Sequence, residues 1–415
     1  MKNAVSDRVM EWSRSHIPRG RLGGVVGDFY GPGGKPEVAE EDLPLFGPYL
    51  LWKWHPPGGA SLGTSFLQSQ RHRLTPDERE YIEQAIAQPW SFLIVTAVKP
   101  GESIGLRDAF TGREVEVREV LASRAVQVRD IVFGQFVRID GVYSLECLGS
   151  MRLPPGAIAT VIEMREALEE KAGVRPVTDA DLNRLGDGLR LRYFKMVERI
   201  RTPPQLTNTD GEPLELHTLS YRLTVTPEQA FVALSPLALP AQQDGLGENT
   251  FDANGALQTV EFVWAKRGNK QHRSWDNTIL AHLSIKGARL EAEVNSAGRA
   301  RRLRAQIKKR LGAGAIFESD HLRSAEALLA AARKAPEPEE EPSPELAEME
   351  RRMREQHMLE WTGTELPILR GKTPRQALLE PDGREIVISL LTEWERRDPA
   401  GVAVARQALG LAPDL

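Results

Sequence analysis

The chain has 415 residues, a formal net charge of −4 at pH 7, and a composition that is 41% hydrophobic and 27% charged. These proportions are typical of a globular protein, and no apolar run approaches the roughly 20 residues that a membrane-spanning helix needs. The length exceeds that of one ordinary core, so we expect several domains, and the small net charge does not by itself indicate a nucleic-acid partner.

The start of the chain, MKNAVSDRVMEWSRSH, has neither the apolar stretch nor the small-residue cleavage site of a secretory signal. The single cysteine, Cys147, excludes an internal disulfide and a zinc site made of several thiolates. Both observations predict a cytoplasmic protein. Cys147 lies in the strand-like stretch YSLECL, so we expect a buried residue rather than a nucleophile.

Residues 1–73 are rich in glycine, proline and aromatic residues, which favours loops over regular elements. The stretch GGVVGD does not fit a dinucleotide-binding fingerprint, because no strand precedes it and no periodic helix follows it. Tyr49, Trp52 and Trp54 are compatible with a stacking platform for bases or sugars. Aromatic residues in a proline-rich segment more often attach that segment to a neighbouring core, and we favour this second interpretation.

Residues 74–155 predict one helix and then a small β-barrel-like domain. Thr75 as N-cap, Pro76 at the first helical position and Glu78 three residues after the cap indicate a capping box. Short stretches with β-branched or alternating residues follow, and turn-forming pairs that contain glycine separate them. Strands of this kind close most easily into a small barrel. The strand-like stretches are SFLIVTAV, REVEVREV, DIVFGQFVRI and GVYSLECL.

Residues 156–334 are expected to form an α+β domain. Two helices come first, the second of them capped by Thr178, and strand-like stretches follow. Alternating residues on both sides of positions 286–287 predict a β-hairpin. Ser296 then caps a basic helix that ends at Gly312.

Residues 335–345, APEPEEEPSPE, are acidic and interrupted by proline, so they cannot bury enough apolar surface to fold. We predict a linker there and a small helical module over residues 346–415. Within that module Leu346, Met349 and Met353 recur at helical spacing. The fold class predicted for the whole chain is α+β and multi-domain, with a small β-barrel-like domain, an α+β hairpin-helix domain and a C-terminal helical module.

The run GKT, which ends at Thr373, has the spelling of a phosphate-binding loop. That loop needs a further glycine five residues before its second one, directly after a buried strand, and Leu366 occupies this place. A helix start accounts for every residue instead, with Thr373 as N-cap, Pro374 at the first helical position and Gln376 reaching back to the cap. We therefore predict a capping box and no nucleotide site.

Two more helices are predicted after this one. Asp382 as cap and Glu385 three residues later begin the first, and Asp398 begins the second, which ends at Gly410. Helices this short are not stable alone, so they must pack on one another or on a partner. The first of them carries a wide apolar stripe of Ile386, Val387, Leu390, Leu391 and Trp394.

The stretch LPILRGKTPRQALLEPDGREIVISLLTEWE resembles the toxin-binding domain of Xre/MbcA/ParS-like antitoxins. That family has a proline, a glycine shortly before threonine-proline, a short helix, a second glycine and an apolar helix in this order. The resemblance covers about the last 50 residues and implies a toxin as protein partner. A helix-turn-helix domain precedes this region in those antitoxins, and none is recognisable here. The partner-binding residues expected from the resemblance and the stripe are Leu366, Pro367, Leu369, Gly371, Thr373, Pro374, Gly383, Val387, Leu390, Leu391 and Trp394.

Most of the chain also resembles little-characterised bacterial proteins related to SEC-C motif proteins. The shared features are LRDAFTGRE in the barrel region, VNSAGR before the basic helix, and the C-terminal tail. Relatives of this kind often carry a cysteine-rich zinc motif, which a chain with one cysteine lacks. This second resemblance implies no particular activity.

The basic helix supports an alternative function, nucleic-acid binding, because cations along one face can contact phosphates. The stretch KRGNKQHR, with Trp264 and Trp275 for stacking, would extend the patch. The opposing interpretation is a solvated face that the acidic linker neutralises. The cations are Arg299, Arg301, Arg302, Arg304, Lys308, Lys309 and Arg310 of the helix, and Lys266, Arg267, Lys270 and Arg273 of that stretch.

No cofactor or metal site is predicted. The stretch TFDANGALQTVE imitates a calcium loop, but Thr250 holds the first ligand position and a strand-like sequence follows, so we interpret Asn254-Gly255 as a hairpin turn. The histidines show no metal-binding or catalytic spacing, and no serine lies in a nucleophile elbow. An enzyme with a dispersed site in the α+β domain would show as a pocket lined by acids and histidines.

These observations favour a cytoplasmic, non-enzymatic binding protein, with no membrane partner, whose C-terminal helical module docks a protein partner. The alternative is a nucleic-acid-binding protein that uses the small barrel and the helix over residues 299–310. Leu390, Leu391 and Trp394 discriminate between two roles of the module. They should be partly exposed if they bind a partner, and fully buried if they close the module's own core.

Overall fold

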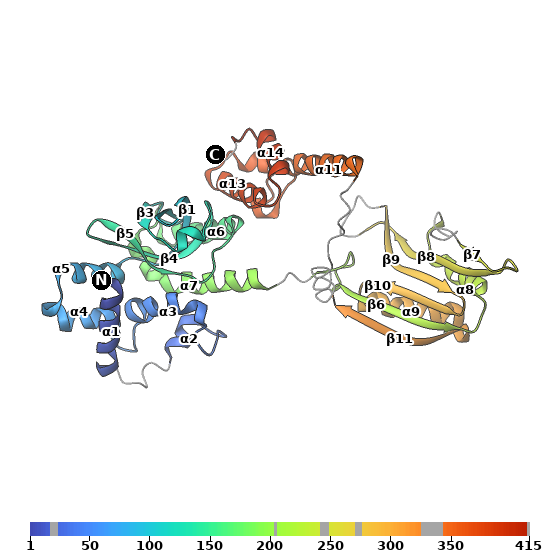
Figure 1. The fold of residues 1–415 in the computed structure, drawn as a ribbon, viewed down its shortest axis with the longest axis horizontal. Coiled ribbons are helices and arrows are strands. Elements are labelled where there is room, and N and C mark those ends of the chain that lie inside the picture. The colour runs from blue at the N-terminus through green and yellow to red at the C-terminus, as the bar shows by residue number, and fades with distance from the viewer. Residues whose placement is uncertain (17–23, 203–205, 241–248, 270–275, 325–342, 413–415) are drawn as a thin grey trace. The chain divides into compact units, whose positions relative to one another are not determined.

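The chain forms two compact units, unit 1 (residues 1–202 and 342–415) and unit 2 (residues 203–341). A closed barrel, a second sheet and C-terminal helices confirm the α+β, multi-domain fold class. None of the helices in the described part of the chain is long and apolar enough to span a membrane. The computed structural model describes residues 1–16, 24–202, 206–240, 249–269, 276–324 and 343–412 (Figure 1).

The N-terminal segment of unit 1 is largely helical, so the prediction of loops over residues 1–73 is wrong. Phe29, Tyr49 and Trp52 are at most 2% exposed, and packing of this kind stabilises helices that are too short to form alone. The interpretation of the aromatic residues as core anchors is thereby confirmed. The helices are α1 (Lys2–His16), α2 (Val25–Tyr30), η2 (Glu40–Asp42), α3 (Leu43–Pro48), η3 (Tyr49–Lys53), α4 (Leu62–Gln70), η4 (Arg71–Arg73) and α5 (Pro76–Ala87).

A closed five-stranded barrel follows, which confirms the predicted small β-barrel-like domain; one strand, β2, was not among the four predicted stretches. Its strand order is β1-β2-β3-β5-β4, in which β3 and β5 pair in parallel and the other neighbours are antiparallel. Val115 and Val117 of β3 are buried while the neighbouring Glu114 and Glu116 are exposed, which is the alternation expected of a strand with one face in contact with solvent. The strands are β1 (Ser91–Lys99), β2 (Ser103–Asp108), β3 (Glu114–Arg118), β4 (Ile131–Ile139) and β5 (Val142–Leu148), with the short helix η5 (Ala122–Arg124) between β3 and β4.

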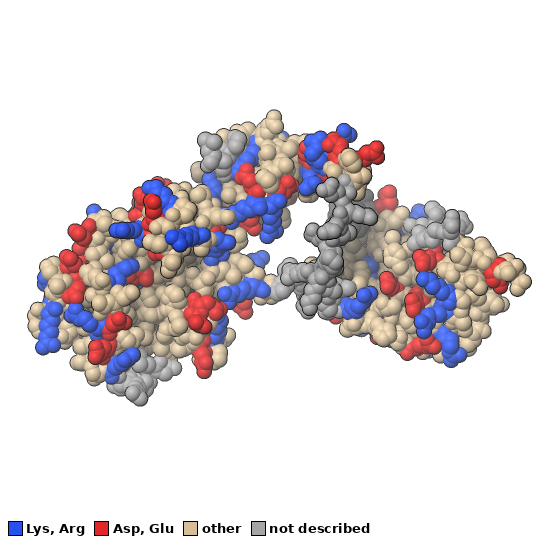
Figure 2. Space-filling view, in the orientation of Figure 1, with Lys and Arg blue, Asp and Glu red and all other residues tan. Residues whose placement is uncertain are grey.

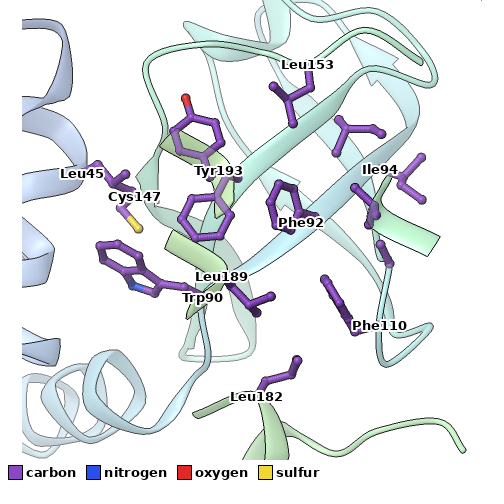
Figure 3. Close-up of a cluster of buried hydrophobic side chains, with 14 of the residues drawn as sticks. Leu45, Trp90, Phe92, Ile94, Phe110, Cys147, Leu153, Leu182, Leu189 and Tyr193 are labelled. Carbon is purple, nitrogen blue, oxygen red and sulfur yellow. The ribbon is translucent and has the colours of Figure 1, made fainter. Parts of the chain in front are cut away.

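Strands β1 and β4 are buried on both faces because helices cover the outside of the barrel. Leu93 and Val132 belong to the cluster inside the barrel, whereas Phe92 and Phe133 belong to a larger core shared with the helices. Tyr193 stacks on Phe133 with ring centroids 4.9 Å apart, and Figure 3 shows it in the same cluster as Phe92. The covering elements include η6 (Pro155–Ala157), α6 (Ile158–Ala172) and α7 (Asp179–Arg201).

The division of the chain therefore differs from the predicted domains. Helices α6 and α7 were expected at the start of the α+β domain, but they belong to unit 1, and the boundary falls at residue 203 instead of 156. The helical module over residues 346–415 also belongs to unit 1. Sequence patterns mark where helices begin and end, but they do not show which core each apolar face joins.

A buried carboxyl group links the N-terminal helices to strand β5. Oε1 of Glu146 accepts hydrogen bonds from Trp52 Nε1 (2.9 Å) and Tyr81 Oη (2.8 Å), and both aromatic side chains are 1% exposed. Burial raises the pKa of Glu146, although the hydrogen bond from Tyr81 and the charge of Lys2 act in the opposite direction. The protonated form of Glu146 is therefore favoured more in the folded chain than in the unfolded chain.

This arrangement predicts opposite results for two substitutions at the same position. Because the pKa is raised on folding, the contribution of Glu146 to stability is fully present below its ordinary pKa and is lost as the pH rises through the folded value. Glu146→Gln should therefore gain stability relative to the natural chain as the pH rises from 4.5 to 7.5, whereas Glu146→Ala should lose about 1–3 kcal/mol for each buried donor left without an acceptor. Urea unfolding at both pH values measures this; a Gln variant with no pH-dependent gain would contradict it.

Unit 2 is a six-stranded sheet, in the order β11-β6-β10-β9-β8-β7, with α8 and α9 packed on one cluster of its apolar side chains. The hairpin at Gly287 and the turn at Gly255, both with positive φ, confirm the two predicted turns. Ser296 caps α9 as expected, through a bond from Arg299 N. The elements are β6 (Glu215–Leu223), α8 (Pro227–Leu234), η7 (Ser235–Leu237), β7 (Thr250–Phe251), β8 (Leu257–Arg267), β9 (Asn277–Lys286), β10 (Arg289–Val294), α9 (Ala297–Leu311), η9 (Gly312–Gly314) and β11 (Ala315–Ser324).

The C-terminal residues return to unit 1 as a set of helices. Most of the predicted linker, residues 335–342, lies outside the described residues. The helices are α11 (Pro344–Thr362), η10 (Pro367–Leu369), α12 (Pro374–Ala377), α13 (Pro381–Glu395) and α14 (Pro399–Ala408). We refer to residues 343–412 as the C-terminal module.

Candidate protein-docking site in the C-terminal module

The stretch around Thr373 is a helix start, as predicted. Thr373 Oγ1 accepts from Gln376 N (3.2 Å), and Thr373 N donates to Gln376 Oε1 (2.9 Å), which completes the capping box. Gly371 N donates to Leu366 O (3.0 Å) and Lys372 N to Leu369 O (3.1 Å). The backbone amides that a nucleotide loop would offer to phosphates are thus already bonded within the module.

Several residues predicted to bind a partner instead form the core of the module. Leu369, Pro374, Val387 and Leu391 are buried, and Leu391 is 0% exposed. Of the three discriminating residues, only Leu390 and Trp394 are partly exposed. Trp394 packs edge-on against Trp361 of α11, with ring centroids 4.9 Å apart.

Gly383 is a packing requirement rather than a partner contact. A Cβ at this position would lie 2.4 Å from Ala377 O and 3.0 Å from Ala377 C, which are backbone atoms and cannot move aside cheaply. The glycine therefore allows α13 to start close against α12.

We expect Gly383→Ala to destabilise the module by about 1–3 kcal/mol, the usual cost of overpacking. Gly363→Ala is a matched control, because a Cβ there would meet only Glu360 O at 3.8 Å. Thermal unfolding followed by near-UV circular dichroism of the tryptophans measures both. Equal melting temperatures for the two variants would contradict the close-approach argument.

Helix α13 docks on the barrel side of unit 1, against η6 and α6. Glu393 Oε2 accepts from Gly156 N at 2.8 Å, and Leu390 lies so close that a Cβ on Gly156 would be 3.3 Å from its Cδ2 atom. The half-buried Leu390, which was predicted to contact a partner, thus contacts another segment of its own chain.

Ion pairs surround this contact. Arg165 donates to Asp382 (2.6 Å), and Arg396 donates to Asp130 (2.8 Å), whose side chain is 1% exposed. Arg107 pairs with Glu385, and Arg370 pairs with Glu166, whose pKa is lowered by the hydrogen bond from Arg370. These ion pairs hold the module against the rest of unit 1.

The prediction that Asp382 caps this helix is wrong, because the side chain of Asp382 makes an ion pair with a distant residue instead. The N-cap position lies two residues earlier, at Glu380, which makes no side-chain cap, and α13 begins at Pro381. Asp382 lies in the first turn, where a negative charge is favourable, and its carboxylate is bonded to Arg165. The ion pair between Arg165 and Asp382 therefore takes the place of the local side-chain cap that the sequence predicted.

The apolar surface that the module leaves exposed lies elsewhere. Leu346, Met349 and Met353 of α11 are 43%, 53% and 61% exposed, and Ile368 and Leu379 are 41% and 86% exposed. Of the residues predicted to bind a partner, Pro367 and Gly371 are also exposed, and Leu366 and Thr373 are partly exposed. Sequence reasoning identified the stripe on α11 but assigned it no role, and it did not single out Ile368 and Leu379.

The alternative nucleic-acid site loses its central cation. Arg299 is 1% exposed and donates to Asp210 (2.9 Å), and Lys266 donates to the same carboxylate at 2.6 Å. Burial alone would raise the pKa of Asp210, but hydrogen bonds from Lys266 and Arg299 outweigh it and hold the pKa below its ordinary value. Arg302 pairs with Glu212 at 2.8 Å. These cations serve the fold of unit 2.

Some of the other predicted cations remain exposed. Arg301, Lys308, Lys309 and Arg267 are exposed, while Lys270, Arg273 and Trp275 lie outside the described residues. On the face shown in Figure 2, basic and acidic side chains are interspersed over both units. In five-stranded barrels of the oligonucleotide-binding type, strands 2 and 3 face the ligand, and here β3 directs two glutamates outward.

The enzyme alternative finds limited support. Unit 2 has a cavity of about 260 Å³ lined by His217, His282 and Glu293, which is smaller than most ligand pockets. His217 is held by Asp320, with Nδ1 2.9 Å from Oδ1. Burial raises the pKa of Cys147 well above its ordinary value, so this thiol is not a nucleophile.

The predicted calcium mimic is a turn. Asp252 Oδ1 accepts from Asn254 N (2.8 Å) and Ala256 N (2.9 Å), so the carboxylate stabilises the hairpin. Within the described ranges no group of three histidine, cysteine or acidic residues is placed to hold a metal ion. In comparisons with known proteins, no family model, no curated protein and no solved structure matches the chain.

Proposed function

We propose that the chain is a non-enzymatic binding protein whose C-terminal module docks a protein partner through the outer face of α11. The observation that carries this proposal is the exposed apolar stripe of Leu346, Met349 and Met353, which we call the α11 stripe. Large apolar side chains grouped on a helix face are characteristic of helices that lie in a partner's groove.

The first part of α11 lacks the packing that normally stabilises a short helix. None of residues 344–357 is buried, and the helix joins the core only from Met358 onward. Ion pairs along the helix, such as Arg351 with Glu355 at 2.6 Å, add little stability because solvent screens both charges. A partner that covers the stripe would supply the missing packing.

The contacts of α13 also support docking through α11. Asp382, Glu393 and Arg396 hold α13 against other segments of unit 1. The module is therefore held in place by α13, while the α11 stripe stays exposed. The resemblance to antitoxin toxin-binding domains makes a toxin the partner that we propose. The residues of α13 that carry the resemblance would then hold the module in place, and α11 would contact the toxin.

Site-specific photocrosslinking in cells tests the docking face. A photoreactive residue at Met349 should give a crosslink to one protein that nuclease treatment does not remove. Arg351 is the matched control, because two residues along a helix place it about 200° away. Equal adducts from both positions, or none from Met349, would refute docking through the stripe.

Reconstitution with the purified partner then tests its class. The triple change Leu346→Glu, Met349→Glu and Met353→Glu should weaken binding by at least about tenfold, which corresponds to about 1.4 kcal/mol. If the partner is a toxin, it should arrest growth when produced alone, and co-production of this chain should restore growth. A partner without that effect would refute the toxin assignment while leaving docking in place.

Nucleic-acid binding is the second candidate, because Arg301, Lys308 and Lys309 stay exposed on α9. If it occurs, binding to single- or double-stranded DNA or RNA should fall steeply with salt and disappear when these three cations are replaced by glutamate. No binding at low salt would exclude it.

A further inference from the structure

Unit 1 contains a cleft, unrelated to the docking module, that the sequence did not predict. Two cavities of about 810 and 450 Å³ share Lys53, His55, Asp187 and Arg190 in their linings, so they adjoin one another, and we refer to both together as the cleft. Helix α7 makes one wall, and η3 makes the floor. Each volume lies within the range of small-molecule pockets, about 300–1,000 Å³.

Lys53 is a partly buried cation that lines both cavities of this cleft. Its Nζ donates to Ile86 O (2.8 Å) and Gln88 O (2.5 Å), carbonyls at the end of α5. Among the described residues, no carboxylate lies within ion-pair distance of it. Burial lowers the pKa of Lys53 to about 8, although the nearby Cys147 and Glu146 act in the opposite direction. An ammonium group has three N–H donors, so one is left for a further acceptor.

Positive charge prevails in the smaller cavity. Lys53, Arg184 and Arg190 line it, and Asp187 is its only acidic lining residue among those described. Asp187 is itself bonded to Arg190 at 2.5 Å, so its charge is already compensated. Arg190 is fixed further by Phe29 O, at 2.9 Å from its Nε. Of the cations that line this cavity, Lys53 has no carboxylate within ion-pair distance among the described residues.

Besides these charged residues, the lining of this cavity contains the polar residues His55 and Asn183 and three large apolar side chains. Trp52, Ile86 and Trp90 line the end near Lys53. A cation next to aromatic walls suits a ligand with an anionic group on a flat, apolar body, because the charge selects the group and the walls exclude water from it.

We propose that this cleft binds a small aromatic anion, with its carboxylate or phosphate on Lys53 and its ring against Trp52 and Trp90. Lys53 also has a structural role, because it bonds the carbonyl groups at the end of α5. That role does not require a cavity beside the side chain. Arg190 is a positioning residue, since its three nitrogen atoms are each bonded to the protein. Arg184 lines the same cavity and also pairs with Asp181, so it adds only a partly compensated positive charge.

Labelling with pyridoxal 5′-phosphate tests the cleft in the natural, full-length chain. This probe is an aromatic phosphate whose aldehyde condenses with an unprotonated amine; water leaves, and borohydride then reduces the imine. Peptide mass spectrometry at pH 7.5 should find Lys53 labelled at least about tenfold faster than Lys195, an exposed lysine of α7. Equal rates would overturn the proposal.

Protection experiments identify the anionic group. Benzoate alone should slow labelling of Lys53 if the site prefers a carboxylate, and inorganic phosphate alone if it prefers a phosphate. Arg184→Gln should raise the protecting concentration about two- to fivefold, whereas Arg192→Gln, on the same helix outside the cleft, should not change it. No protection by either anion, or the same shift for both variants, would overturn the assignment.

Discussion

Replacing Arg299 with alanine is expected to lower the free energy of unfolding of unit 2 by about 3 kcal/mol, near the lower end of the cost of breaking a buried ion pair. The guanidinium donates to Asp210 (2.9 Å), to Thr209 Oγ1 (2.8 Å) and to Ile279 O (3.1 Å), so it joins three segments of the unit. Lys266 would still compensate part of the charge of Asp210, which is why the lower end applies.

Arg301→Ala is the matched control, because Arg301 lies on the same helix and is exposed. Its cost should stay within about 0.5 kcal/mol, as for most surface substitutions. Hydrogen exchange in the full-length chain, read at amides of β6 and β10, separates the stability of unit 2 from that of unit 1. If both variants exchange alike, Arg299 does not hold these segments together.

The same experiment bears on nucleic-acid binding. If Arg299 contacted phosphates, its replacement would weaken binding without unfolding the unit. Because the side chain is enclosed, loss of binding in the alanine variant would follow from loss of structure. Only the exposed cations of α9 can therefore test that alternative.

Local patterns in the sequence predicted local structure well. Thr75, Thr178, Ser296 and Thr373 all cap helices as expected, since the donor and acceptor of each cap lie within three residues. Four of the five barrel strands were predicted, because their residues alternate, or run continuously where both faces are covered. Strand β2 was not predicted, although its burial also alternates.

Contacts between distant residues were not predictable in the same way. Arg299 and Asp210 are 89 positions apart, and Arg165 and Asp382 are 217 apart, so no spacing rule connects them. The stripe on α13 shows the difference most clearly. Its helical period was visible in the sequence, but the sequence did not show that Val387 and Leu391 face the module core while Leu390 faces α6 and η6.

The second large effect is expected at Leu391, where alanine should cost about 2–5 kcal/mol, the range for truncating a fully buried leucine. Leu391 is 0% exposed, and its cluster includes Val387 and Val402. The cavity left by the missing atoms cannot be filled by water at low cost, because its lining is apolar. Denaturant unfolding followed by hydrogen exchange in α13 and α14 measures the loss.

Leu379→Ala is the same chemical change at a position that is 86% exposed, so the stability of the module should hardly change. Binding to a partner separates the core from the proposed docking face. Met349→Ala, in the α11 stripe, should lower affinity without lowering stability, whereas Leu391→Ala can reduce binding only in proportion to unfolding. If Leu391→Ala instead left the module fully stable and abolished binding, α13 would be the docking face, and its contact with η6 would have to open before a partner could bind.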